Sequence, residues 1–178
     1  MRTGTIVLVA YLLCVAVASI WRLVPWIGDA IPDLGALSAA YLGLTARRQV
    51  SPAIGGAIVL GYLIDLISGA PPGLIALVLA LTTLVARAVQ QRILVRGAAI
   101  SIAFSAFVAL VAGVDALVVR VLYRMPSAAF SIELEHVGLV TLATAAFGPL
   151  VWRIFRRIDA AFARTHRERE AALEGLAP

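Results

Sequence analysis

The hydrophobic residues of this chain are gathered into six runs, separated by short segments rich in arginine, proline and glycine. A helix of about 20 apolar residues is long enough to cross the hydrocarbon core of a membrane. The pattern therefore predicts an all-α integral membrane bundle of six transmembrane helices within residues 1–152, followed by a basic cytoplasmic tail over residues 153–178. The expected helices cover residues 5–21, 34–46, 52–68, 73–94, 97–123 and 133–152.

Composition supports this class. The chain has 178 residues, of which 62% are hydrophobic and 14% are charged, against about 25% charged in an ordinary soluble domain. The net charge of +5 comes from fifteen arginines, without any lysine. In a membrane protein such charges report topology, so we expect the lipid bilayer as the partner of the basic segments and no nucleic acid.

The second run is short for a span. Its 13 residues reach about 20 Å as a helix, whereas the hydrocarbon core is about 30 Å thick, so a re-entrant segment is an alternative. If all six runs span and the N-terminus is cytoplasmic, twelve of the fifteen arginines lie inside. The positive-inside rule therefore favours six spans with both termini in the cytoplasm.

The two ends of the chain carry further expectations. Residues 16–18 read Ala-Val-Ala and resemble a signal-peptidase site, so a cleaved signal peptide is an alternative for the first run. We expect Trp21 and Trp26 at the outer interface and Trp152 at the inner one. Beyond Trp152, Ile154 and its neighbours at helical spacing share a face, which predicts a helix lying along the inner membrane surface.

Asp65 is the one ionisable residue in the third run, and the Pro/Gly turn 68–73 follows it. An Asp at the centre of a spanning helix costs about 2.5–3.5 kcal/mol on insertion scales, so a compensating partner is expected. The carboxylate could clamp the turn by hydrogen bonds or pair with Arg120 or Arg22. Alternatively, it contacts a ligand or a partner protein.

Counting residues from the inner surface places Asp65 and a second carboxylate in the outer part of the membrane. The same count predicts a polar cluster on the outer side, formed by Arg22, Asp115, Arg120, Glu133 and His136. Glu133 also lies at the start of the sixth run, where it can interact with the positive end of the helix dipole.

Patterns that carry catalysis are weak. The two histidines, His136 and His166, are predicted on opposite sides of the membrane, so a shared metal site finds no support. A phosphate-binding glycine loop of the P-loop kind is also missing from the sequence. We therefore expect that the chain is not an enzyme and has no catalytic residue, metal or cofactor. A membrane enzyme that uses Asp65 and His136 remains an alternative.

Small residues recur at four-residue spacing along the runs, which lets helices approach closely. The pairs are Ala36 and Ala40, Ala39 and Gly43, Ala57 and Gly61, Ser101 and Ser105, Ala109 and Gly113, and Thr144 and Gly148. Packing within the bundle is the simplest interpretation, and a partner's single membrane helix is the alternative.

The segment AIGGAIVLGYLIDLISGAPPGLIAL, residues 53–77, resembles the signature region of MreD, the rod shape-determining membrane protein. A glycine-rich helix, Asp-Leu, Ser-Gly and a Pro/Gly turn follow in the family's order, although the family often has one proline followed by leucine where this chain has Pro71 and Pro72. The matching positions are Gly61, Asp65, Ser68, Gly69 and Gly73.

The resemblance implies a non-catalytic component of the cell-elongation machinery in the bacterial inner membrane. It implies MreC as the direct partner, with MreB filaments and the peptidoglycan polymerase and transpeptidase as indirect partners. The five matching positions would then serve the helix–turn architecture or contact MreC. The alternative function is the substrate-capture S-component of an energy-coupling-factor vitamin transporter, which has a similar size and topology.

Overall fold

The computed structural model describes residues 2–23, 30–46, 50–69, 71–91, 98–122 and 130–174, with side chains through residue 164 except those of Arg22 and Ala98. These residues form six helices and no strand. Trp26 and the side chain of His166 lie outside the described part. The helices are α1 Arg2–Arg22, α2 Leu34–Thr45, α3 Ser51–Ser68, α4 Leu74–Gln90, α5 Ala98–Leu122 and α6 Phe130–Glu174.

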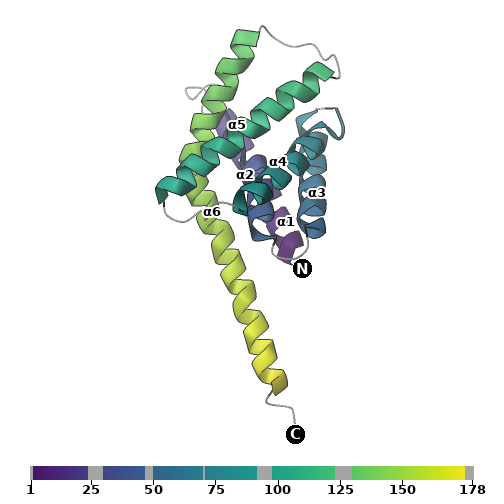
Figure 1. Ribbon diagram of the computed structural model, residues 1–178, viewed down its shortest axis with the longest axis vertical. Helices are drawn as coiled ribbons and strands as arrows, with labels where there is room; N and C mark the ends of the chain where they lie inside the picture. Colours follow the sequence, from purple (N-terminus) through teal and green to yellow (C-terminus); the bar gives the residue numbers. More distant parts are fainter. Residues whose placement is uncertain are drawn as a thin grey trace.

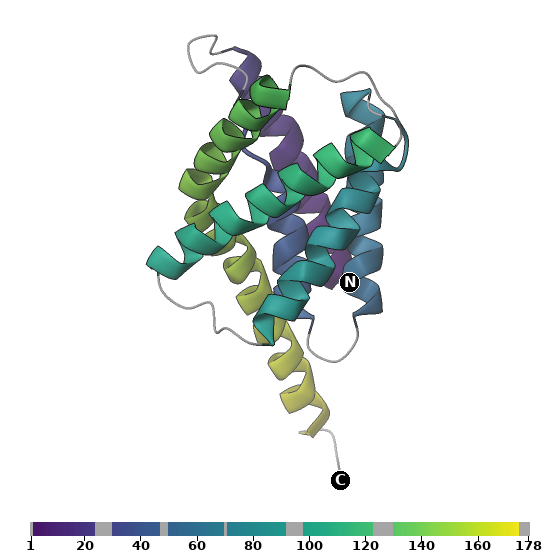
Figure 2. The ribbon, with the colours of Figure 1, turned by 45° about the horizontal axis from the view of Figure 1, so that its top comes forward.

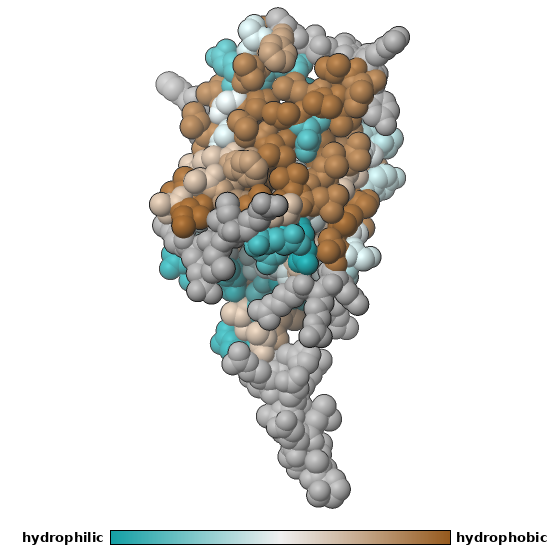
Figure 3. All heavy atoms as spheres, viewed as in Figure 1, coloured by the Kyte–Doolittle hydropathy of each residue, from teal (hydrophilic) through white to brown (hydrophobic). Residues whose placement is uncertain are grey.

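The all-helical fold agrees with the prediction, and four helices, α1, α3, α5 and α6, are long and apolar enough to cross a membrane. Their outer faces carry apolar side chains such as Leu8, Leu66 and Leu142, which are more than half exposed. Figure 3 shows apolar side chains across the middle of one face of the bundle, with hydrophilic groups gathered below them. Four helices of this kind agree with the predicted class of a multi-pass membrane protein.

The short helix α2 lies at the centre of the bundle. Every residue from Leu34 to Gly43 is buried, and α2 contacts each of the other five helices. A helix enclosed by protein does not need to match the thickness of the lipid, since its neighbours and not the lipid surround it. This position explains why a run of this length is tolerated.

Small residues allow the close packing around α2 and α3. A Cβ added at Gly43 would collide with the backbone carbonyl of Thr83 in α4, and the Thr83 hydroxyl donates a hydrogen bond of 3.1 Å to the Ala39 carbonyl in α2. A Cβ added at Gly61 in α3 would collide with the backbone of Ala76 in α4. Among the described residues, these predicted small-residue pairs thus serve contacts within the bundle.

Helix α5 lies obliquely across α4 in both ribbon views, and α6 packs beside α5 (Figures 1 and 2). Both views also show α6 changing direction about midway. A proline inside a helix removes a backbone hydrogen bond and kinks it, and Pro149 lies inside α6.

The sixth helix is much longer than the expected segment 133–152. It continues without interruption to Glu174 and projects from the bundle at the end where α1 begins (Figure 1). Phe155 is fully buried, and Trp152 is 6% exposed and packs edge-on against Tyr41 and Phe104. The packed part of the molecule therefore extends past Trp152, and Trp152 is a core residue instead of the interfacial anchor that the sequence suggested.

Candidate functional site

The carboxylate of Asp65 fastens the end of α3 to the start of α4. Asp65 is 2% exposed. Its Oδ2 accepts a hydrogen bond of 2.9 Å from the Gly73 N–H, its Oδ1 accepts one of 2.9 Å from the Ile75 N–H, and Oδ2 accepts a longer one of 3.4 Å from the Ala76 N–H. The first N–H groups of a helix have no partner within the helix. Asp65 supplies those partners from the neighbouring helix, and its negative charge lies at the positive end of α4.

The other motif residues shape the same turn. Gly69 ends α3 with φ of 68°, and Gly73 precedes α4 with φ of 96°. A side chain rarely adopts this left-handed region, so glycine is favoured at both places. The Ser68 hydroxyl donates a 3.4 Å hydrogen bond to the Asp65 carbonyl. The structure therefore agrees with the prediction of a hydrogen-bonded clamp on the turn.

Arg120, one of the two arginines expected to pair with Asp65, lies elsewhere. Its guanidinium contacts Glu133, with Nη1 and Oε1 4.0 Å apart. The side chain of Arg22, the other candidate, lies outside the described part of the chain. Backbone N–H groups satisfy the Asp65 carboxylate in their place.

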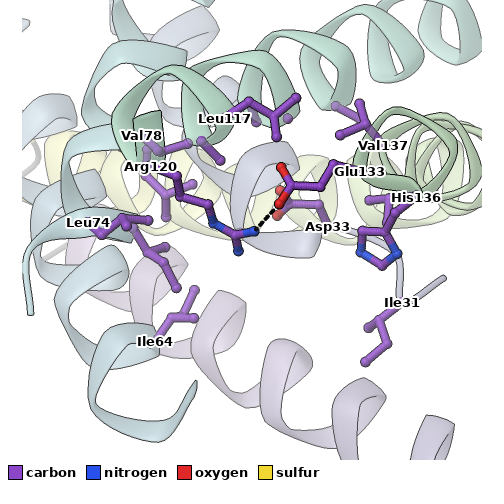
Figure 4. A pocket seen from close by; sticks show the side chains of 18 of the residues that line it. Ile31, Asp33, Ile64, Leu74, Val78, Leu117, Arg120, Glu133, His136 and Val137 are labelled. Carbon is purple, nitrogen blue, oxygen red and sulfur yellow. Dashed lines mark ion pairs between the residues drawn. The ribbon is translucent and has the colours of Figure 1, made fainter. Parts of the chain in front are cut away.

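Three residues of the predicted outer cluster line one cavity. Arg120 from α5 and Glu133 and His136 from α6 surround a space of about 600 Å³, within the range of about 300–1,000 Å³ that is usual for ligand sites. Figure 4 shows the Arg120 and Glu133 side chains pointing toward one another inside it. Asp115 does not line the cavity, and its buried Oδ2 has no hydrogen-bond partner among the described residues.

The sequence analysis missed a fourth polar residue of this cavity, Asp33. Its Oδ1 accepts a 2.7 Å hydrogen bond from the Ala36 N–H and caps α2, while its own N–H donates to the Thr144 hydroxyl in α6 at 2.9 Å. Burial raises the pKa of the Asp33 carboxyl, and the N–H groups of Ala36 and Gly35 partly offset this rise. An acidic residue directly before an apolar run was the signal for an N-cap that could have found it.

A second polar cluster consists of Arg2, Tyr41 and Asp159. We call it the inner clamp, because the expected six-span topology places it on the inner side. Arg2 Nε and Nη2 donate to the two carboxylate oxygens of Asp159 at 2.6 Å each, and the Tyr41 hydroxyl donates to Oδ2 at 2.6 Å. Paired N–H donors of this kind form some of the strongest side-chain contacts. The inner clamp joins α1, α2 and α6 at the end of the bundle opposite the Asp65 turn.

The geometry does not bring the residues of the proposed membrane enzyme together. His136 lines the cavity, whereas Asp65 is buried at the α3–α4 turn and does not line it. Among the described residues, no group of three or more His, Cys, Asp or Glu side chains is arranged to hold a metal ion.

These features describe an all-helical protein with four helices long and apolar enough to cross a membrane, a hydrogen-bonded turn after α3, and the cavity lined by Arg120, Glu133 and His136. We call this the outer cavity, because the expected six-span topology places it on the outer side. Comparisons do not narrow the class further. No protein-family model, no curated protein and no solved structure matches this chain.

Proposed function

We propose that this chain is a non-catalytic scaffold of the MreD kind, in the bacterial inner membrane. It would bind MreC and through it help to couple MreB filaments to peptidoglycan synthesis, thereby maintaining cell shape. The observation that carries the proposal is the unit formed by Gly61, Asp65, Ser68, Gly69 and Gly73. These positions, on which the resemblance rests, act together in one turn, through close backbone packing, left-handed glycines and the Asp65 hydrogen bonds.

The role of this unit in the proposal is architectural. All three hydrogen bonds of the Asp65 carboxylate go to the start of α4, and the side chain is buried. A group that is buried and satisfied within the chain is poorly placed to contact MreC directly. The unit instead sets the angle between α3 and α4, and so the shape that the pair presents to a partner.

The proposed topology has six spans with both termini in the cytoplasm. The inner clamp supports it, since Arg2 and Asp159 lie together at one end of the bundle, as an even number of crossings requires. The concentration of arginine in the segments at that end is a second support. Reporters fused after residue 178 test this proposal. We expect activity from a cytoplasmic reporter, and activity only from a periplasmic one would contradict it.

Purification of the tagged chain from its native cells in mild detergent, followed by mass spectrometry, tests the partner. We expect MreC and other cell-elongation proteins to co-purify. Asp65→Ala should lose MreC only together with folded yield, because its effect passes through the fold, whereas Ser68→Ala should retain both. A well-folded wild-type chain that recovers no MreC would contradict the scaffold.

The outer cavity favours one second candidate, the S-component of an energy-coupling-factor transporter. Such a subunit needs a ligand site on the outer side, and the cavity lies there in the six-span arrangement. The same purification separates the two functions, because recovery of a transmembrane coupling subunit with paired ATPases would identify the transporter.

A further inference from the structure

The outer cavity is lined mostly by apolar side chains, together with the polar residues Asp33, Arg120, Glu133 and His136. Uncharged residues of α4, α5 and α6 make up most of its walls. The lining side chains that face this space include Val78, Leu79, Ala109, Ala112, Ala116 and Val140. Apolar walls of this kind accept a hydrocarbon chain, because burying its surface is favourable while no polar group is desolvated.

The charged residues of the cavity carry both signs. Arg120 lies near the end of α5, and Glu133 lies near the start of α6. Figure 4 shows Asp33 behind them and His136 beside them. The 4.0 Å between Arg120 and Glu133 is at the outer limit of an ion pair, longer than the roughly 2.7–2.9 Å of a charge-assisted hydrogen bond. A zwitterionic group lying beside this pair can place its anionic part against the Arg120 guanidinium and its cationic part against the Glu133 carboxylate.

We propose that this cavity binds one phospholipid with a zwitterionic, amine-bearing headgroup, of the phosphatidylethanolamine class. The lipid phosphate contacts the Arg120 guanidinium, the primary ammonium contacts Glu133, and one acyl chain lies along the apolar walls. The site rests on the cavity alone. The proposed six-span topology would place this lipid in the outer leaflet.

The charges of the cavity favour a zwitterionic lipid over an anionic one. A purely anionic lipid would satisfy Arg120 but would bring no cation to the neighbouring Glu133 carboxylate.

Lipid retention measured by native mass spectrometry tests the proposal. The delipidated full-length chain is incubated with equimolar phosphatidylethanolamine, phosphatidylglycerol and phosphatidylcholine of the same acyl chains, and bound lipid is counted after a detergent wash. We expect phosphatidylethanolamine to exceed phosphatidylglycerol by about tenfold. Phosphatidylcholine should bind less than phosphatidylethanolamine, because its quaternary ammonium has no N–H to donate.

Two variants separate the headgroup contacts. Glu133→Gln should lower phosphatidylethanolamine to the level of phosphatidylglycerol, and Arg120→Gln should lower both lipids. Glu135→Gln and Arg157→Gln are the matched controls, because both side chains are exposed and neither lines the cavity. Both controls should bind as the wild type does.

A third variant tests the apolar wall. Ala116→Phe places a ring in the cavity and should abolish retention of every lipid, with thermal unfolding measured beside it to show that the chain still folds. Equal retention of phosphatidylethanolamine and phosphatidylglycerol would overturn the proposal. So would wild-type binding by Glu133→Gln, or preferential retention of a polyprenyl phosphate.

Discussion

Asp65 shows how the backbone of a neighbouring helix can satisfy one acidic side chain inside an apolar helical bundle. Its carboxylate replaces the intrahelical partners that the first N–H groups of α4 lack. Hydrogen bonds to a charged group each contribute about 1.5–3 kcal/mol, and an unsatisfied donor costs about as much. The turn after α3 is therefore held by a polar contact in an otherwise apolar part of the bundle.

Replacement of Asp65 by alanine should lower the free energy of unfolding by about 2–4 kcal/mol, because at least two backbone donors lose their acceptor. Thermal unfolding in detergent measures this loss. Ser68→Ala is the control on the same turn, since its single 3.4 Å bond is weak, and it should change stability by less than about 0.5 kcal/mol. Equal stability of wild type and Asp65→Ala would show that the clamp is unimportant.

The outer cavity illustrates what a single sequence can and cannot specify at this scale. Counting residues along a helix gives the depth of a side chain, and this placed Arg120, Glu133 and His136 at one level. Depth does not give direction around the helix axis. Asp115 was placed in the same outer region but does not line the cavity, and Asp33 was missed because it precedes its helix.

At the scale of the helix, the positions of the apolar runs along the sequence were more informative about the fold than the length of each run. The positions of all six helices followed from the runs of apolar residues, because exclusion of charge from lipid acts on every residue of a span. Length was misleading for α2, which is enclosed by protein. The helical spacing of Ile154 and its neighbours, in contrast, correctly predicted a helix beyond Trp152, and α6 remains helical to Glu174. Small-residue spacing correctly indicated where helices approach, but it did not show which helix is the neighbour.

Two glycines of α3 offer a matched test of that packing. Gly61→Ala should destabilise the protein by about 1–3 kcal/mol, because the new Cβ would collide with the Ala76 backbone and force α3 and α4 apart. Gly55→Ala should be neutral or slightly stabilising, since nothing lies within 4 Å of its added Cβ. Thermal unfolding of the two variants compares them, and a stable Gly61→Ala protein would refute the close α3–α4 contact.

At the scale of the whole molecule, the inner clamp connects the beginning of the chain to its last helix. Arg2 and Asp159 are 157 residues apart in sequence, and Tyr41 of the central helix bonds to the same carboxylate. The aromatic rings of Tyr41, Trp152 and Phe155 pack beside this clamp. The first part of the arginine-rich segment is thus part of the folded bundle.

Two truncations test this extension of the bundle. A chain ending after residue 164 keeps Phe155 and the inner clamp, so its folded yield should match the full chain. A chain ending after residue 152 loses both and should give a several-fold lower yield, or a broad elution profile, in size-exclusion chromatography of the detergent extract. Identical profiles for the two truncations would contradict the role assigned to residues 153–159.

The central position of α2 also has a consequence for biosynthesis. Membrane helices leave the ribosome in chain order, yet α2 is enclosed by α4, α5 and α6 as well as by its neighbours in sequence. When only the first three helices have been made, the helix that is most buried in the finished protein still faces lipid or the insertion machinery. Its final environment exists only after the last helix has been synthesised.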